Sequence, residues 1–151
     1  GNERGMASEK FKRGIGHVID CDADPFVPEG LAVEEHRKGG LIDLAKVKIA
    51  LFLAKCQKMV AVGGHALRKE LADQPVLNAN VLDHYLANPH LIPEEWKGKA
   101  VFFWGTIYRY RGGGLYVRCL YWDGDRWSWS GRWLDSGWDS GDPAACRQAS
   151  A

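Results

Sequence analysis

The stretch VFFWGTIYRYRGGGLYVRCLYWDGDRWSWS (residues 101–130) decides the fold class of this chain. Aromatic and β-branched residues fill three segments, 101–110, 115–122 and 126–130, which are separated by the turn sequences Gly-Gly-Gly and Asp-Gly-Asp. Glycine-containing turns between such segments are typical of antiparallel hairpins. We therefore expect an antiparallel meander of three strands, with a possible fourth short strand over residues 132–134.

The two turns also predict which side chains share a face of the sheet. A three-residue glycine turn pairs Arg111 with Leu115, and a two-residue turn pairs Trp122 with Trp127. Because side chains alternate across a sheet, one face collects Phe103, Ile107, Leu115, Val117, Cys119 and Tyr121. The other face collects Trp104, Tyr108, Tyr110, Tyr116, Arg118, Trp122, Trp127 and Trp129.

We call the first set the aliphatic face and the second set the aromatic face. The aromatic face is the candidate ligand or partner surface, because Trp and Tyr with interleaved Arg are enriched at interface hot spots. The ordinary alternative is that these rings stack as cross-strand pairs or close a second core. Self-association and binding of sugars or of single-stranded nucleic acid remain open. For nucleic acid the stacking residues are Tyr108, Arg118 and Trp122.

The rest of the chain predicts a mixed α+β domain. Strands are expected over residues 17–21 and 31–36, and helices over 64–72 and from Asn78 or Asn80 to Leu86, with one helical turn at 92–96. Residues 43–58 fit a strand and a helix, with the strand favoured. We expect the two helices to pack on the aliphatic face. We also expect a flexible segment 1–16, a single domain 17–140 and a loose tail 141–151.

Composition narrows the functional classes. The chain of 151 residues is 46% hydrophobic and 26% charged, with a net charge of +1. The even spread of charge makes nucleic-acid binding unlikely, because such binding needs a basic field. The four cysteines form no CxxC pair, and no apolar run reaches the length of a membrane span. These features predict a cytoplasmic protein with reduced thiols and no membrane contact.

A dense acidic cluster, Asp20, Asp22 and Asp24, is the one candidate metal site. A calcium-binding EF-hand loop is excluded, because Pro25 and Leu31 stand where that loop needs Gly and Glu. Two of these carboxylates with His17 or His36 could still hold a metal ion. Turn and capping roles for the aspartates are more ordinary, and no cofactor is predicted.

Catalytic patterns are incomplete. Glu34 and His36 share a face of the expected strand and could form an acid–base pair, although solvated polar groups on a strand are the more ordinary explanation. Cys21 has only a sequence neighbour, His17, as a possible base. The glycine runs at 63–64 and 112–114 lack the Lys of a phosphate-binding loop. An enzyme is therefore not favoured.

Several motifs resemble a family of small bacterial proteins of unassigned function, of the kind found on mobile integron gene cassettes. They are HVIDCDADPFVPEG (17–30), VEEHRKGG (33–40), LRKELADQPVLNANVLDHYLANPHLIPEEWKGK (67–99), VFFWGTIYR and YVRCLYW. The similarity spans about residues 17 to 143. The resemblance implies a bacterial cytoplasmic setting and an accessory role, and it supplies no activity.

Three functional hypotheses follow. The leading one is a non-enzymatic binding or interaction protein, a homodimer that uses the aromatic face. The alternative is a metal-dependent hydrolase or phosphoryl-handling enzyme at Asp20, Asp22 and Asp24. A further alternative is a single-strand nucleic-acid binder.

Overall fold

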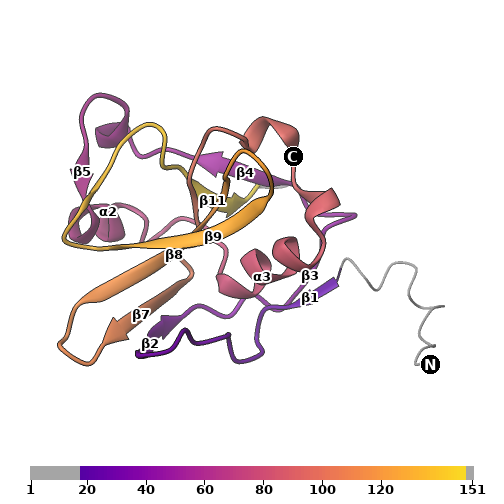
Figure 1. Cartoon of the computed structure of the whole chain (residues 1–151), viewed down its shortest axis with the longest axis horizontal. Coiled ribbons are helices and arrows are strands. Elements are labelled where there is room, and N and C mark those ends of the chain that lie inside the picture. Colours follow the sequence, from indigo (N-terminus) through magenta and orange to yellow (C-terminus); the bar gives the residue numbers. More distant parts are fainter. Residues whose placement is uncertain (1–17, 149–151) are drawn as a thin grey trace.

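The computed structural model describes residues 18–148 (Figure 1). The predicted flexible segment 1–16 and the candidate ligand His17 lie outside this range. The strands are β1 (Val18–Asp20), β2 (Leu31–His36), β3 (Leu41–Asp43), β4 (Ile49–Phe52), β5 (Val62–Gly63), β6 (Val101–Phe102), β7 (Thr106–Tyr110), β8 (Leu115–Trp122), β9 (Trp127–Trp133), β10 (Gly137–Trp138) and β11 (Ala144–Arg147). The helices are α2 (Gly64–Glu70), α3 (Ala79–Ala87) and the 3₁₀ turns η1 (Lys55–Lys58), η2 (Pro89–Leu91) and η3 (Glu94–Trp96).

The main element is a curled, mixed sheet of seven strands in the order β2-β7-β8-β6-β11-β4, with β9 paired to β8 (Figure 1). Two further pairs, β1 with β3 and β5 with β10, are antiparallel. The α+β class is therefore as expected. A meander of three to four strands is not confirmed as the unit of the fold, because β7, β8 and β9 belong to this larger sheet.

The helices begin where the sequence predicts. The side chain of Asn78 accepts a hydrogen bond from the amide of Asn80 at 3.0 Å and caps α3, as Asn does at helix starts. The ambiguous residues 43–58 contain the strand β4 followed by the turn η1. The preference for a strand is thus confirmed for the centre of that segment.

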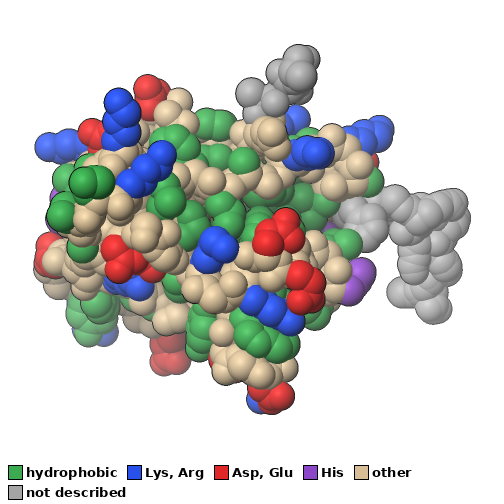
Figure 2. All heavy atoms as spheres, turned by 90° about the horizontal axis from the view of Figure 1, so that it is seen from above, with side chains coloured by type: hydrophobic (Ala, Val, Ile, Leu, Met, Phe, Trp, Pro, Cys, Tyr) green, Lys and Arg blue, Asp and Glu red, His purple; other side chains and the backbone are tan. Residues whose placement is uncertain are grey.

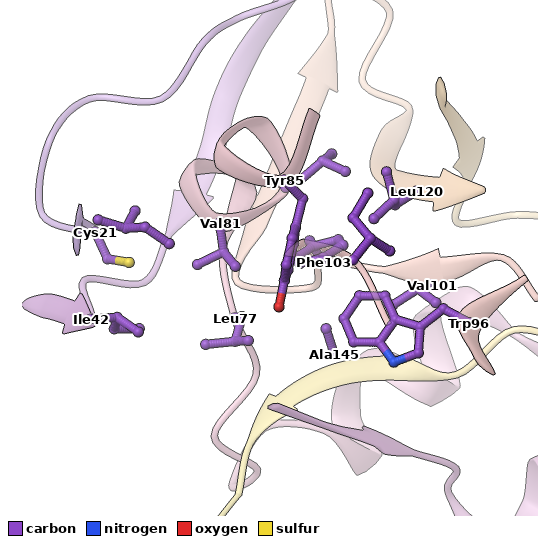
Figure 3. Close-up of a cluster of buried hydrophobic side chains, with 13 residues drawn as sticks. Cys21, Ile42, Leu77, Val81, Tyr85, Trp96, Val101, Phe103, Leu120 and Ala145 are labelled. Carbon is purple, nitrogen blue, oxygen red and sulfur yellow. The ribbon is translucent and has the colours of Figure 1, made fainter. Parts of the chain in front are cut away.

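Each face of the sheet carries its own hydrophobic core. The first core contains Val81, Leu82 and Tyr85 of α3, with Phe103 and Leu120 from the sheet side. Figure 3 shows Tyr85 extending from α3 toward Phe103. The ring centroids of Tyr85 and Trp96 are 5.4 Å apart. The expectation that both helices pack on the aliphatic face is wrong for α3.

The second core lies on the opposite face, under α2. Leu67 and Leu71 pack there with Ile107, Val117 and Cys119. Trp104 also lies in this core, 2% exposed, so it does not belong to the aromatic face. The strand is interrupted at residues 103–105, where Gly105 packs closely against the backbone of Asn78. A Cβ atom at position 105 would lie only 2.7 Å from the backbone nitrogen of Asn78.

The hairpin registers agree with the sequence in one turn and differ in the other. Trp122 pairs with Trp127 as predicted. In the glycine turn Leu115 pairs with Arg109 instead of Arg111. A shift of two residues preserves the alternation of faces, so the predicted face survives for every residue of β7, β8 and β9.

The C-terminal segment differs most from expectation. Ala144–Arg147 forms β11, parallel to β6 and antiparallel to β4. Ala144, Ala145 and Cys146 are buried. The expectation of a loose tail from residue 141 is therefore wrong for the described part of this segment. The small side chains suit a strand that is packed between two others.

Two further observations concern the described residues. None of the helices in the range 18–148 is both long and apolar enough to cross a membrane. All four cysteines have free thiols.

Candidate functional site

The aromatic face exists, with a changed membership. Cross-strand partners share a face of the sheet. Five of the predicted residues lie on one side by the pairs Tyr108–Tyr116, Tyr116–Trp133, Arg118–Gly131 and Trp122–Trp127, and Trp104 does not. Tyr110 and Trp129 lie on the same side by alternation. This is the side that α3 covers in part.

The centre of this face is closed by α3 and by the loop before β2. Arg118 is 1% exposed and donates to both carboxylate oxygens of Asp83 on α3, at 2.8 and 3.0 Å. Its guanidinium lies 4.2 Å from the ring centre of Trp129 and 5.1 Å from that of Phe26. The buried hydroxyl of Tyr108 donates to the carbonyl of Phe26 at 2.8 Å.

These contacts fix the charge states at the centre. Burial alone would lower the pKa of Arg118, but the hydrogen bonds and the charge of Asp83 raise it overall. Burial raises the pKa of Tyr108. Arg118 therefore stays cationic and Tyr108 stays neutral. Neither side chain is available to stack on a nucleic-acid base in this conformation, which removes two of the three residues of that hypothesis from the surface.

The outer end of the face is open, and its three rings form a surface that we call the aromatic ledge: Tyr110, Tyr116 and Trp133. Tyr110 is 45% and Trp133 is 42% exposed. The ring of Trp133 lies 4.9 Å from Tyr116 and 5.9 Å from Tyr110, centre to centre. Figure 1 shows that this end of the β7–β8 hairpin projects away from both helices.

Trp133 was not among the predicted surface residues. The sequence pattern predicts a strand that ends before Gly131, whereas β9 runs without a break to Trp133. The ring of Tyr116 lies against Gly131, where any Cβ would collide with it. The signal was present in the sequence, because Trp127, Trp129 and Trp133 keep the spacing of a single strand.

The ring geometry of the ledge distinguishes between ligand classes. The planes of Trp133 and its neighbours Tyr110 and Tyr116 are inclined by 83° and 61°. Sugars and bases stack on flat ring faces, whereas edge-to-face clusters are the usual packing of aromatic side chains in cores and interfaces. The ledge therefore suits a protein surface better than a stacked ligand.

The ledge adjoins an open strand edge. Within residues 18–148 the only strand paired with β9 is β8. The backbone bonds Leu134 N to Leu115 O and Asp123 N to Arg126 O place the hydrogen-bonded pairs of β8 and β9. By alternation, the N–H and C=O groups of Trp127, Trp129 and Gly131 point away from β8.

The other end of the face is smaller. Trp122 and Trp127 pack edge to face with centroids 5.5 Å apart. The ammonium group of Lys97 lies 3.9 Å from the ring centre of Trp122. Both tryptophans are half-buried, so this end offers less apolar surface than the ledge.

The acidic cluster is occupied by turn contacts. The carboxylate of Asp20 accepts the amide of Asp22 at 3.0 Å, and that of Asp22 accepts the amide of Gly40 at 2.9 Å. Asp24 is exposed. Within the described range, no group of three or more His, Cys, Asp or Glu side chains is arranged to hold a metal ion.

The proposed acid–base pair is not assembled either. The ring of His36 bonds Thr106 at 2.8 Å and the carbonyl of Ala23 at 3.0 Å. Glu34 instead pairs with Arg109 at 3.3 Å. Both ring nitrogens of His36 are thus used to hold the loop before β2 against the sheet.

The three buried cysteines are poor nucleophiles. Burial raises the pKa of Cys21, Cys119 and Cys146 to about 11 in each case. Since the thiolate is the reactive form, these thiols stay protonated near neutral pH.

Hydrophobic side chains also reach the surface elsewhere. Figure 2 shows them in the middle of the face seen from above, with charged side chains around them. Leu41, Met59 and Val60 are the most exposed, at 71%, 86% and 67%. Scattered exposed apolar residues are ordinary, whereas the ledge combines ring contacts with an open strand edge.

Comparison with protein-family models, with curated proteins and with solved structures finds no match to this chain.

Proposed function

We propose that this chain is a non-enzymatic binding protein that pairs with a second copy of itself through β9 and the aromatic ledge. The observation that carries the proposal is the open edge of β9, a seven-residue strand with tryptophans at both ends and no strand on its outer side within the described residues. Exposed edges of this kind pair with other strands unless charges, prolines or bulges prevent it.

The sequence of β9 is compatible with its own copy. Antiparallel pairing about a two-fold axis at Ser130 would bring the outward backbone groups of Trp129 opposite those of the partner's Gly131. Trp127 would lie opposite the partner's Trp133. The one charged residue of β9, Arg132, would face Ser128 and not another charge. Such an isologous contact is the commonest arrangement of homodimers.

The net charge of +1 opposes pairing only weakly. Backbone hydrogen bonds along the strand would supply the register, and the ledge would supply apolar area next to it. A homodimer of this kind would bury Trp133, which is 42% exposed in the single chain beside the rings of Tyr110 and Tyr116.

The proposal is tested at the axis itself, where Ser130 would meet the partner's Ser130. Ser130 is exposed in the single chain, so a charge at this position leaves the fold intact. We expect sedimentation velocity to show a dimer for the wild type and a monomer for Ser130→Lys and for Ser130→Glu, because like charges directly opposite destabilise a strand pair. An equimolar mixture of the two variants should regain the dimer.

Met59→Lys is the control, because Met59 is 86% exposed and remote from β9 in sequence. This variant adds one charge and should remain a dimer. A wild type that sediments as a monomer at every concentration overturns the proposal. Variants at Ser130 that dimerise as strongly as the wild type would place the interface elsewhere and equally overturn it.

A further inference from the structure

A cavity of about 570 Å³ lies on the opposite face of the sheet from the aromatic ledge, between β2 and α2. Its lining side chains are Glu35, Arg37, His65, Arg68, Lys69 and Ala72. Glu35 pairs with Ile107, which faces α2 in the second core. The cavity is therefore separate from the surface assigned to self-association.

Four of the lining residues form one face of a helical segment. His65, Arg68, Lys69 and Ala72 follow the spacing i, i+3, i+4 and i+7, which brings side chains to a single stripe. The cavity holds three permanent cations against one carboxylate, whereas the whole chain carries a net charge of only +1. Positive charge is thus concentrated here.

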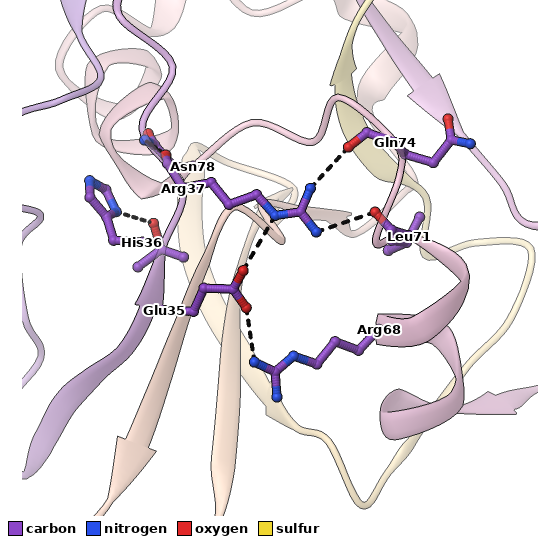
Figure 4. Close-up of polar contacts among 8 residues, drawn as sticks. Glu35, His36, Arg37, Arg68, Leu71, Gln74 and Asn78 are labelled. Carbon is purple, nitrogen blue, oxygen red and sulfur yellow. Dashed lines mark hydrogen bonds and ion pairs between the residues drawn. The ribbon is translucent and has the colours of Figure 1, made fainter.

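Two of the cations are held in place before any ligand arrives. Figure 4 shows Glu35 between Arg37 and Arg68. Its carboxylate lies 3.5 Å from Nε of Arg37 and 2.8 Å from Nη2 of Arg68. Arg37 also donates to the carbonyls of Gln74 at 3.0 Å and Leu71 at 3.3 Å. Side chains that are already ordered lose less entropy when a ligand binds.

Donors remain after these contacts are counted. Arg68 contacts Glu35 through a single terminal nitrogen, so its other N–H groups have no partner among the described residues. The ammonium of Lys69 likewise has none there. His65 uses Nε2 for Asp135, at 3.1 Å, which leaves its other ring nitrogen. Guanidinium and ammonium groups in this arrangement are the usual partners of phosphate oxygens.

We propose that this cavity binds a phosphate group, with Arg68 and Lys69 as its direct contacts and with Glu35 and Arg37 as the frame that positions Arg68. The volume lies within the range of small-ligand sites and leaves space beyond a single phosphate. The ligand is therefore either inorganic phosphate or a small phosphomonoester, and the two share the same anchoring chemistry.

The test is a titration of the ¹⁵N-labelled protein followed by NMR, with inorganic phosphate added at constant ionic strength against chloride. Saturable shifts are expected in α2 and at Glu35. Lys69→Ala and Arg68→Gln should each weaken phosphate binding about tenfold, the effect of one charge-assisted contact. Arg68→Gln also removes the Arg68–Glu35 ion pair and could disturb α2. Lys69 is exposed, so Lys69→Ala keeps the fold and tests the site independently.

Arg111→Ala is the matched control, because Arg111 is an exposed cation in the β7–β8 turn. Phosphate affinity in this variant should equal that of the wild type. Shifts that do not saturate, or equal weakening in Arg111→Ala and Lys69→Ala, overturn the site in favour of general charge attraction. A second titration with glycerol phosphate separates the two sources: tighter binding than inorganic phosphate assigns the remaining space to an organic group, and equal binding assigns the site to the free anion.

Discussion

Arg118 is the residue that divides the aromatic face. Its guanidinium is bonded at both terminal nitrogens to Asp83 and lies against the rings of Phe26 and Trp129, which also contact each other edge to face. The pair attaches α3 to the centre of the face and leaves the end beyond Tyr108 open. A buried charge whose partner is removed is strongly destabilising, whatever the net worth of the intact pair.

Replacing Asp83 by Ala should therefore lower the free energy of unfolding by about 3 kcal/mol. The reason is that Arg118, 1% exposed, would keep its charge without a counter-charge. Urea unfolding measures the change. Asp125→Ala is the control, since Asp125 lies in an exposed turn and its removal should change stability by less than about 0.5 kcal/mol. Equal effects at the two positions would contradict the role assigned to the pair.

The same residue scale shows what the sequence could predict. Alternation placed Tyr116, Trp122, Trp127 and Trp129 on one face correctly, because a two-residue period is read directly from neighbours. It failed at Trp104, because the strand breaks where Gly105 meets Asn78, a residue 27 positions away. Pairing of Arg118 with Asp83, which lies 35 positions away, has no local signal either.

At the scale of elements, β11 is the largest difference between expectation and structure. Its residues Ala144, Ala145 and Cys146 are small and follow a stretch rich in Gly, Ser and Asp, which is typical of a loose end. They are nevertheless buried between β6 and β4. Short periodicity cannot reveal a strand whose partners are distant, and small side chains give no apolar signal.

Ala145→Asp should unfold the protein or cost more than about 4 kcal/mol, because a carboxylate would enter the first core at a position 0% exposed. Circular dichroism with urea unfolding gives the measurement. Arg147→Ala in the same strand is the control and should be nearly neutral, since the side chain of Arg147 is exposed. A folded, wild-type-like Ala145→Asp variant would mean that β11 is not part of the sheet.

At the scale of the whole molecule, the sheet formed by the described residues has α3 on one face, α2 on the other and an uncovered end at the aromatic ledge. The sequence predicted both helices, because their apolar stripes are local. It could not predict that α2 and α3 take opposite faces, since an apolar stripe does not say which face of a sheet it meets. That arrangement leaves the aromatic ledge and the edge of β9 open on one side and the cationic cavity on the other.

Amide hydrogen exchange in β9 tests whether a second copy completes the outer edge of this strand. The amides of Trp127, Trp129 and Gly131 point away from β8, whereas those of Ser128, Ser130 and Arg132 are bonded to it and serve as internal controls. In a dimer paired through β9, the outward amides should become protected as protein concentration rises through the dimerisation range, while the inward amides stay protected throughout. Outward amides that exchange at the same fast rate at every concentration would contradict it.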